Sequence, residues 1–422
     1  MNPIATVNIA LAMLFFICYA YQAFYIAVPF VKKPTPHRPA QQNRFAVLIA
    51  ARNEAAVIGY LIDSIHAQTY DPERITVFVI ADNCTDDTAR VAQAAGAVVY
   101  KRNNTRRVGK GYALNELLHN IRRDYPDDLF DGFFVFDADN VLDPHYIEEM
   151  NRTFSDGYEI VTSYRNSKNY GDNWISAGYG LWFLRESKYL NNARMLLHTS
   201  CAVGGTGFLF HRAVMERTGG WNFFLLTEDI EFTINRVVNG EKIGYCSRAV
   251  LYDEQPTSFR QSWNQRMRWA KGFLQVFRKY GSSLLRRAAK GSFSAYDMVM
   301  TTMPAMLLSI CGILINIACL IVGIAGKDRV LIETGGIALL QTLVTTYLGA
   351  FAIGLITTIT EWQQIHTTTA RKIGYLFTFP LFMLTYIPIA LCAIFRKVRW
   401  TPIAHQRAAS VAEICAPQKP AA

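Results

Sequence analysis

The chain has 422 residues and a formal net charge of +10 at pH 7, with 51% hydrophobic and 18% charged residues. An excess of basic residues fits a nucleic acid, an anionic lipid surface or a phosphorylated small molecule as partner. Zinc-finger spacing and arginine-rich tracts are absent and the basic residues crowd beside apolar segments, so the composition argues against nucleic acid and favours a membrane with an anionic substrate.

The first predicted element is an apolar stretch at residues 4–31, followed directly by Lys32 and Lys33. A membrane span needs about 20 apolar residues. A cleaved signal peptide carries basic residues before its apolar core, whereas here they follow it. The positive-inside rule therefore predicts an uncleaved anchor with residue 32 onward in the cytosol. The eight cysteines form no Cys-x-x-Cys pair, which is typical of reduced, unpaired thiols in a cytosol-like compartment. They therefore agree with the predicted cytosolic location.

Residues 43–281 alternate apolar runs with amphipathic segments. The apolar runs predict strands at 45–50, 75–81, 95–100, 132–140 and 159–165. Strands that are buried on both faces and joined by helices form a doubly wound, mostly parallel α/β sheet. Ligands of such sheets bind outside the carboxyl ends of the strands, and Asn53, Asp82 and Asp137 all fall there.

Asp137 and Asp139 leave the fourth predicted strand two positions apart. Two carboxylates in this place can direct their oxygens to one site, and such hard ligands suit Mg²⁺ or Mn²⁺ bridging a diphosphate. The metal would neutralise charge that builds on a departing diphosphate. Exposed acidic turns produce the same short pattern, but the buried apolar run in front of it favours the metal site.

The sequence Thr227-Glu228-Asp229 opens a later predicted helix, where Asp229 is a candidate general base for a sugar hydroxyl. An exposed first helical turn, stabilised by the helix dipole, is the alternative. The glycine-rich stretch at 201–210 supports the catalytic interpretation, because glycine lets the backbone approach a ligand closely.

Residues 258–280 predict a basic amphipathic helix lying on the membrane face. Within it, Gln265, Arg268 and Trp269 form a Gln-x-x-Arg-Trp motif. An arginine can hold phosphate oxygens bidentately, and an indole face stacks on a pyranose ring. Lys110, in the sequence GKGYAL, is either a phosphate ligand or an ordinary loop lysine.

The region 298–395 holds the remaining apolar stretches, at 298–324, 330–360 and 373–395. Their length and near absence of charge predict membrane helices rather than buried core helices. Three full spans would place the basic tail at 396–422 outside the cell, against the charge rule. Pro380 and Pro388 interrupt the last stretch, so one segment lying in the interface or re-entering the membrane is the alternative.

Taken in order, Asn53-Glu54, Asp82, Asp137-x-Asp139, Thr227-Glu228-Asp229 and Gln265-x-x-Arg268-Trp269 resemble the membrane-embedded family 2 glycosyltransferases. This group includes cellulose, chitin, hyaluronan and poly-N-acetylglucosamine synthases. The resemblance covers about residues 43–281 by motif and the remainder by architecture. It implies a cytosolic α/β domain of the GT-A (Rossmann-like) fold, α-helical transmembrane segments and an inverting transferase that uses a UDP-sugar and Mg²⁺ or Mn²⁺.

The resemblance also implies roles for individual residues. Asp229 would deprotonate the acceptor hydroxyl, and Asp139 would bind the metal. The residues that would bind the nucleotide sugar are Asn53, Glu54, Asp82, Lys110, Asp137, Gln265 and Arg268. The residues that would bind the acceptor are Gly205, Thr206, Glu228 and Trp269.

The predicted enzyme is a multi-pass protein of the cell membrane that extends a β-linked polysaccharide and translocates it. The alternative is a non-processive enzyme that glycosylates a lipid such as diacylglycerol or ceramide. A transporter or a catalytically silent scaffold is disfavoured by the intact acidic motifs. With fewer spans than cellulose synthases have, translocation would need a smaller channel, a small membrane partner subunit or a homo-oligomer. Trp400-Thr401 in the tail resembles the gating segment of some synthases, which requires a cytosolic tail.

Overall fold

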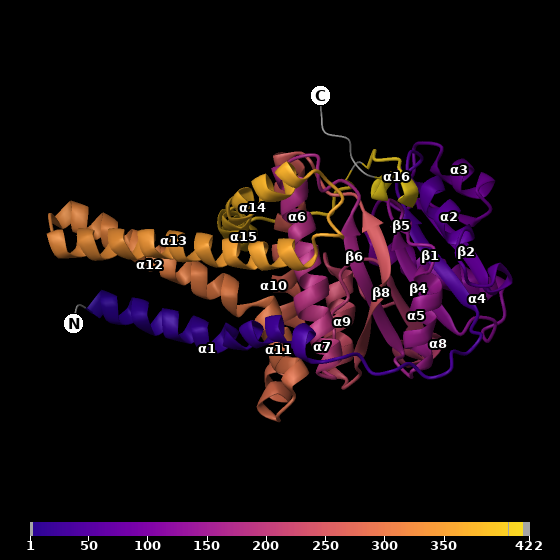
Figure 1. Ribbon diagram of the computed structural model, residues 1–422, viewed down its shortest axis with the longest axis horizontal. Coiled ribbons are helices and arrows are strands. Elements are labelled where there is room, and N and C mark those ends of the chain that lie inside the picture. Colours follow the sequence, from indigo (N-terminus) through magenta and orange to yellow (C-terminus); the bar gives the residue numbers. More distant parts are fainter. Residues whose placement is uncertain (1–2, 404, 417–422) are drawn as a thin grey trace.

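The computed structural model describes residues 3–403 and 405–416. A sheet covered by helices forms one end of the molecule, and long apolar helices project from it on one side (Figure 1). The strands are β1 (Phe45–Ala51), β2 (Ile75–Asp82), β3 (Val98–Arg102), β4 (Gly132–Asp137), β5 (Val141–Leu142), β6 (Ile160–Ser167), β7 (Phe208–His211) and β8 (Ile243–Asp253).

The eight-stranded sheet has the order β3-β2-β1-β4-β7-β6-β8-β5. All neighbouring strands pair in parallel except at β7 and β5, which run antiparallel to their neighbours. The central strands are buried almost throughout, because their apolar runs must be covered on both faces. The prediction of a mostly parallel α/β sheet is confirmed.

The five predicted strands agree with the structure to within three residues at each end, and the two largest differences follow from turns. The third strand begins at Val98 because Gly96 adopts a φ of +93° after the preceding helix. The fourth ends at Asp137, since the N–H of Asn140 bonds back to the Asp137 carbonyl at 3.1 Å. β5, β7 and β8 are not among the predicted strands.

The helices that cover the sheet are α2 (Ile58–His66), α3 (Thr88–Ala94), α4 (Lys110–Asp124), α5 (Tyr146–Ser155), α6 (Trp174–Arg185), α7 (Asn192–Leu196), α8 (Arg212–Thr218) and α9 (Glu228–Val238). A 3₁₀ turn spans Pro72–Arg74, and a π-helical segment at Glu186–Asn191 joins α6 to α7. Such segments are uncommon and often lie at functional sites.

The remaining helices are α1 (Pro3–Val31), α10 (Phe259–Ala289), α11 (Phe293–Thr302), α12 (Pro304–Gly326), α13 (Arg329–Thr360), α14 (Thr369–Leu384), α15 (Tyr386–Phe395) and α16 (Val411–Cys415). Within the part of the chain that the structure describes, four helical segments are candidate membrane spans by length and composition, namely Ile4–Val31, Leu307–Gly326, Arg329–Thr360 and Thr369–Phe395. In Figure 1, α1, α12 and α13 extend to the left, while α14 stays beside α6 and α15 beside α10.

The fourth candidate segment bends at Thr385, between α14 and α15. Near its start, the Tyr375 hydroxyl donates to the Gly171 carbonyl of the sheet domain at 3.4 Å. Near its end, the Lys271 ammonium of α10 donates to the Ala393 carbonyl at 3.0 Å. The segment therefore begins beside the sheet domain and ends beside α10.

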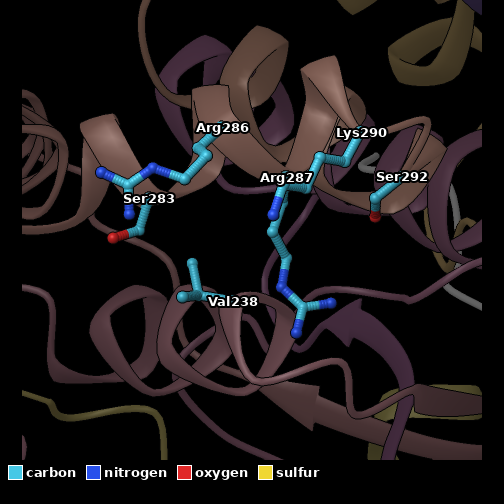
Figure 2. A pocket seen from close by; sticks show the side chains of 6 residues that line it. All are labelled: Val238, Ser283, Arg286, Arg287, Lys290 and Ser292. Atoms are coloured by element: carbon cyan, nitrogen blue, oxygen red, sulfur yellow. The ribbon is translucent and has the colours of Figure 1, made fainter.

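Helix α10 is the predicted amphipathic helix, but it continues beyond residue 280 to Ala289. Its added turns remain amphipathic, because Leu284 is fully buried with Met298 of α11 while Leu285 is exposed. A cavity of about 460 Å³ opens at this end of the helix, between α9, α10 and α11 (Figure 2).

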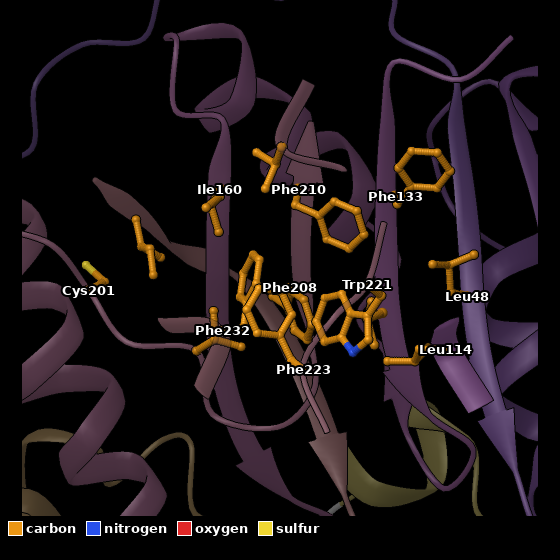
Figure 3. Close-up of a cluster of buried hydrophobic side chains, with 14 of the residues drawn as sticks. Leu48, Leu114, Phe133, Ile160, Cys201, Phe208, Phe210, Trp221, Phe223 and Phe232 are labelled. Atoms are coloured by element: carbon orange, nitrogen blue, oxygen red, sulfur yellow. The ribbon is translucent and has the colours of Figure 1, made fainter. Parts of the chain in front are cut away.

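An aromatic cluster in the core positions the start of α9 (Figure 3). Trp221 is 1% exposed and stacks on Phe232 with ring centroids 5.1 Å apart, while Phe223 meets Phe232 edge-on. Such aromatic pairs stabilise a fold beyond the area that they bury. Because Phe232 lies one turn after Glu228, its burial fixes the first turn of α9 against the sheet.

Candidate active site

The site lies at the carboxyl edge of the parallel strands. β2, β1 and β4 are neighbours in the sheet, so the residues at their carboxyl ends lie along one edge. Asp82 ends β2, Asn53 follows β1 and Asp137 ends β4. The structure therefore brings these three predicted residues together, as the position of strand ends requires.

Asp82 and Asn53 form the outer part of this edge. Asp82 is 4% exposed and its Oδ1 accepts a 2.6 Å bond from Arg102. Burial raises the pKa of Asp82, and the Arg102 guanidinium offsets only part of that effect. Asn53 has a φ of 58°, and its side-chain oxygen accepts from the Thr85 N–H at 2.8 Å. This bond ties the loop after β1 to the loop after β2.

Lys110 connects two parts of the site. It begins α4, and its ammonium forms an ion pair with Asp137 and donates to the Gly205 carbonyl at 2.8 Å. Gly205 has a φ of +87°, and a Cβ built on it would lie 3.6 Å from Oδ2 of Asp229. The neighbouring Thr206 hydroxyl accepts a 2.9 Å bond from the Asp137 N–H. The lysine, the glycine-rich loop and two predicted carboxylates thus lie close together.

Asp139 is more buried than Asp137, with 4% of its surface exposed. Its Oδ2 accepts the Glu254 N–H at 2.8 Å. Burial favours the protonated carboxyl, but the positive charges of His405 and Lys168 and the Glu254 N–H hold the pKa of Asp139 below its usual value. Asp139 is therefore a carboxylate, the form that binds a cation.

The donor set fits a magnesium or manganese ion only together with a substrate. Among the described residues, no group of three or more His, Cys, Asp or Glu side chains surrounds one metal position. Asp137 and Asp139 supply oxygen ligands alone, which are the ligands that these hard cations prefer. A diphosphate would have to bring further oxygens.

Glu228 and Asp229 are the first two residues of α9, and they do not form an exposed acidic turn. Glu228 is 8% exposed. Burial raises its pKa to about 7, and the charge of Asp229 adds to the effect. Burial also raises the pKa of Asp229, although Lys110 and Arg268 act in the opposite direction. The Glu228 carboxyl therefore titrates near neutral pH.

The Gln-x-x-Arg-Trp motif borders the same turn from α10. The Arg268 charge acts on both acidic residues of the turn. The Trp269 ring packs edge-on against Tyr179 and Phe183 of α6, with centroids 5.7 and 6.2 Å away. Oε1 of Gln265 is buried without a hydrogen-bond partner within the described part of the chain.

Residues 42–272, more than half of the chain, match the family described as "Glycosyltransferase like family 2". The chain belongs to glycosyltransferase family 2. The predicted family is thereby confirmed, and with it the identification of the protein as an enzyme.

Relatives of this glycosyltransferase carry two kinds of name. It is 27% identical over 240 residues to a β-monoglucosyldiacylglycerol synthase of Synechocystis sp., covering 56% of this chain and 48% of that protein. It is 24% identical over 247 residues to a poly-β-1,6-N-acetyl-D-glucosamine synthase of Staphylococcus epidermidis, covering 56% of each. The chain thus spans about half the length of the curated relatives it matches.

A solved structure agrees in fold. A mannosyltransferase from Pyrobaculum calidifontis, solved with GDP-Man and Mn²⁺, aligns with a TM-score of 0.54 and 16% identity, covering 93% of this chain and 99% of that one. This likeness confirms the GT-A-like fold.

The tail of this glycosyltransferase supplies residues that the sequence did not point to. Nδ1 of His405 lies 2.9 Å from Oε1 of Glu54, and the N–H groups of Gln406 and Arg407 bond to the Glu254 carboxylate at 3.0 and 2.8 Å. Burial raises the pKa of Glu54 to about 7. Burial disfavours the imidazolium, but nearby carboxylates outweigh it and raise the pKa of His405 to about 10. The tail therefore lies over the site.

Two further buried groups support the glycine-rich loop. The Arg165 guanidinium pairs with Asp253 at the end of β8 and donates to the Gly204 carbonyl at 2.8 Å. Because Gly204 precedes Gly205, this arginine fixes the loop from the side opposite Lys110. No short motif marks Arg165 or Asp253, since they meet only when β6 and β8 pair.

Proposed function

We propose that this glycosyltransferase transfers a sugar from a UDP-sugar, with inversion, to a hydroxyl of a membrane-borne acceptor. The observation that carries the proposal is the proximity of Lys110, Gly205 and Asp229. It supports a cation for the diphosphate close to a carboxylate for the acceptor. The choice of UDP rests on the motifs that resemble the family.

The donor would lie along the strand edge. Asn53, Glu54 and Asp82 would face the nucleoside, and the ammonium of Lys110 would face the diphosphate, joined by Arg268 and Gln265 from α10. Mg²⁺ or Mn²⁺, held by Asp139 with Asp137 beside it, would supply charge neutralisation for the diphosphate.

The transfer is a single displacement. The acceptor oxygen attacks the anomeric carbon, the bond from that carbon to the diphosphate oxygen breaks, and the acceptor proton passes to Asp229. A raised pKa suits Asp229 to this task, because a base is most effective when its pKa approaches the working pH. Glu228, Gly205, Thr206 and Trp269 would position the acceptor.

Asp229→Asn tests the role of the base. We expect transfer to fall by at least about 100-fold while UDP affinity stays within about twofold, because the amide keeps its shape but cannot accept the proton. The matched control is Asp127→Asn, which alters an exposed loop residue. Transfer by Asp229→Asn at a near-normal rate would overturn the assignment.

For the acceptor, the packing of the long helices favours a lipid. α1, α12 and α13 contact one another, and helices at the usual interaxial distance of about 8–10 Å leave no lumen between them. The fourth apolar segment begins beside the sheet domain and ends beside α10. This packing supports a lipid acceptor, because a lipid can reach the site from the bilayer without a channel through the protein. The glucosyldiacylglycerol synthase relatives support this acceptor class.

The second candidate is synthesis of a β-linked polysaccharide, which the poly-N-acetylglucosamine synthase relative supports. It would need a partner subunit or a homo-oligomer to complete a channel. Incubation with radiolabelled UDP-glucose, UDP-N-acetylglucosamine and UDP-galactose distinguishes the two. A chloroform-soluble product is expected for the lipid acceptor, and a large, hydrolase-sensitive product would contradict it.

We further propose that the sheet domain faces the cytosol and that the chain is a multi-pass protein of the cell membrane. Lys32 and Lys33 follow α1 on the sheet side, and the basic residues after α15 return to the same side, which satisfies the positive-inside rule. The exposed Cys415 reports the orientation. An impermeant maleimide should label it in inside-out vesicles and not in intact cells, and labelling in intact cells would reverse the orientation.

A further inference from the structure

Three of the six residues that line the cavity at the end of α10 are basic. Its volume is about 460 Å³, and its lining residues are Val238, Ser283, Arg286, Arg287, Lys290 and Ser292. In Figure 2, Arg287 extends from α10 toward the level of Val238, with Ser283 and Arg286 on one side of the space and Ser292 on the other. Cations and hydroxyls are the groups that bind phosphate oxygens, and no acidic residue lines the cavity.

The positive charges of this cavity are not neutralised within the described residues. Neither an ion pair nor a side-chain hydrogen bond is recorded there for Arg286, Arg287 or Lys290, although other arginines of the chain form buried pairs. Cations in the last turn of a helix interact favourably with the helix dipole, which explains their position in the sequence. The dipole does not explain why the three cationic side chains converge on one cavity. Their mutual repulsion opposes this convergence unless an anion binds between them.

Local packing holds the cavity open. Arg287 is half-buried, and its Nη1 would lie 3.1 Å from a Cβ built on Gly240. Gly240 has a φ of +86°, so the loop after α9 turns away and leaves room for the guanidinium. Opposite it, Ser292 caps α11, whose first N–H groups point to the same region.

The cavity lies beside the aromatic residues where α1 meets the sheet domain. The Tyr21 hydroxyl of α1 donates to Asp297 of α11 at 2.7 Å, and the Tyr21 ring lies 5.7 Å from Phe293. Next to the cavity, Leu285 and Phe293 are 51% and 40% exposed. Aromatic rings and exposed apolar side chains gather at the membrane–water interface, where lipid headgroups are. Figure 1 shows α10 and α11 crossing the ends of the projecting helices at this level.

We propose that this cavity binds the phosphate of an anionic phospholipid headgroup at the membrane surface on the sheet side. The arginines and Lys290 would contact the phosphate oxygens, and Leu285 with Phe293 would lie against the acyl chains. The site is separate from the donor site, whose phosphate ligands are Lys110 and Arg268, and it does not depend on which sugar or acceptor the enzyme uses. Free inorganic phosphate shares the same chemistry and is the other source of the ligand.

The test uses the full chain purified in neutral detergent and titrated with fluorescent phosphatidylglycerol or phosphatidylcholine. We expect phosphatidylglycerol to bind more tightly, and Arg286→Gln/Arg287→Gln to weaken its binding by about tenfold or more, because each cation near an anionic headgroup contributes a factor of roughly five. The matched control is Arg122→Gln/Arg248→Gln, which removes two exposed arginines from the sheet domain and should leave the affinity unchanged.

A second arm separates the two sources of phosphate. If inorganic phosphate alone binds the full chain and this binding is lost in the double variant, the cavity is a site for a soluble anion. If phosphatidylglycerol binds and inorganic phosphate does not, the result supports the headgroup. The single variant Arg286→Gln is included in case the double variant fails to fold, because this side chain is exposed. It should weaken binding by about fivefold. Equal binding of both lipids, unaltered affinity in the variants, or an equal loss in the control would overturn the proposal.

Discussion

The acidic turn of α9 makes the protein's stability depend on pH in a specific direction. Burial, followed by the charge of Asp229, raises the pKa of Glu228 from 4.5 to about 7. The unfolded chain therefore releases this proton above pH 4.5, while the folded chain keeps it up to about pH 7. The stability that the neutral carboxyl contributes is complete below pH 4.5 and is lost as the pH rises to 7. At about 1.4 kcal/mol for each pH unit, the loss reaches about 3 kcal/mol.

Glu228→Gln keeps the shape of the side chain and removes its titration. We expect the gain in stability from this substitution to be roughly 2 kcal/mol larger at pH 8 than at pH 5. With about 2.1 cal/mol per kelvin and residue for a domain of roughly 240 residues, this corresponds to about 4 °C in the thermal midpoint. The assay is thermal unfolding of the full chain in detergent at both pH values.

The control for this experiment is Glu216→Gln on α8, an exposed carboxyl whose replacement should shift the midpoint equally at both pH values. If the gain from Glu228→Gln is no larger at pH 8 than at pH 5, burial does not hold Glu228 in its neutral form, and the electrostatic account of the turn fails.

Three further substitutions test other contacts. Asp297→Asn leaves the Arg194 charge buried without its carboxylate, so the free energy of unfolding should fall by about 3–5 kcal/mol; an unchanged thermal midpoint would contradict this. His405→Ala removes the bond to Glu54, and initial rates should show a KM for the donor raised by about fivefold, an effect that a tail without contact to the site would not produce. Lys110→Met removes the cation that we propose contacts the diphosphate, and calorimetry should find UDP affinity reduced by about tenfold or more.

The parallel strands could be predicted because their physics is local. A strand buried on both faces needs a continuous apolar run, and a polar turn such as those at Asp82 and Asp137 marks its end. β7 could not be predicted in the same way, because it has only four residues, Phe208–His211, and runs antiparallel between β4 and β6. Its pairing depends on strands far away in the sequence.

The motifs identified the kinds of residue at the site but not their partners. The sequence left two interpretations of Lys110 open, a phosphate ligand or a loop lysine. Its hydrogen bond to Gly205 joins positions 95 residues apart. His405 lies 351 residues from Glu54, so neither local pattern nor spacing could connect them. One usable signal was present: His405 is the lone histidine of the tail, and a titratable residue in a basic, apolar segment warrants attention.

One fully buried ion pair and one partly exposed ion pair attach the sheet domain to the C-terminal helices. Arg194 of α7 pairs with Asp297 of α11, which also accepts bonds from tyrosines of α1, and Glu361 after α13 pairs with Lys188 and accepts from Tyr164 of β6. Desolvation cancels much of the attraction within such pairs, so they add little net stability compared with apolar packing. They do restrict geometry, because each charge tolerates burial only beside its partner. The same attachments therefore fix the position of the acidic turn relative to the apolar helices, as the proposed transfer to a membrane-borne hydroxyl would require.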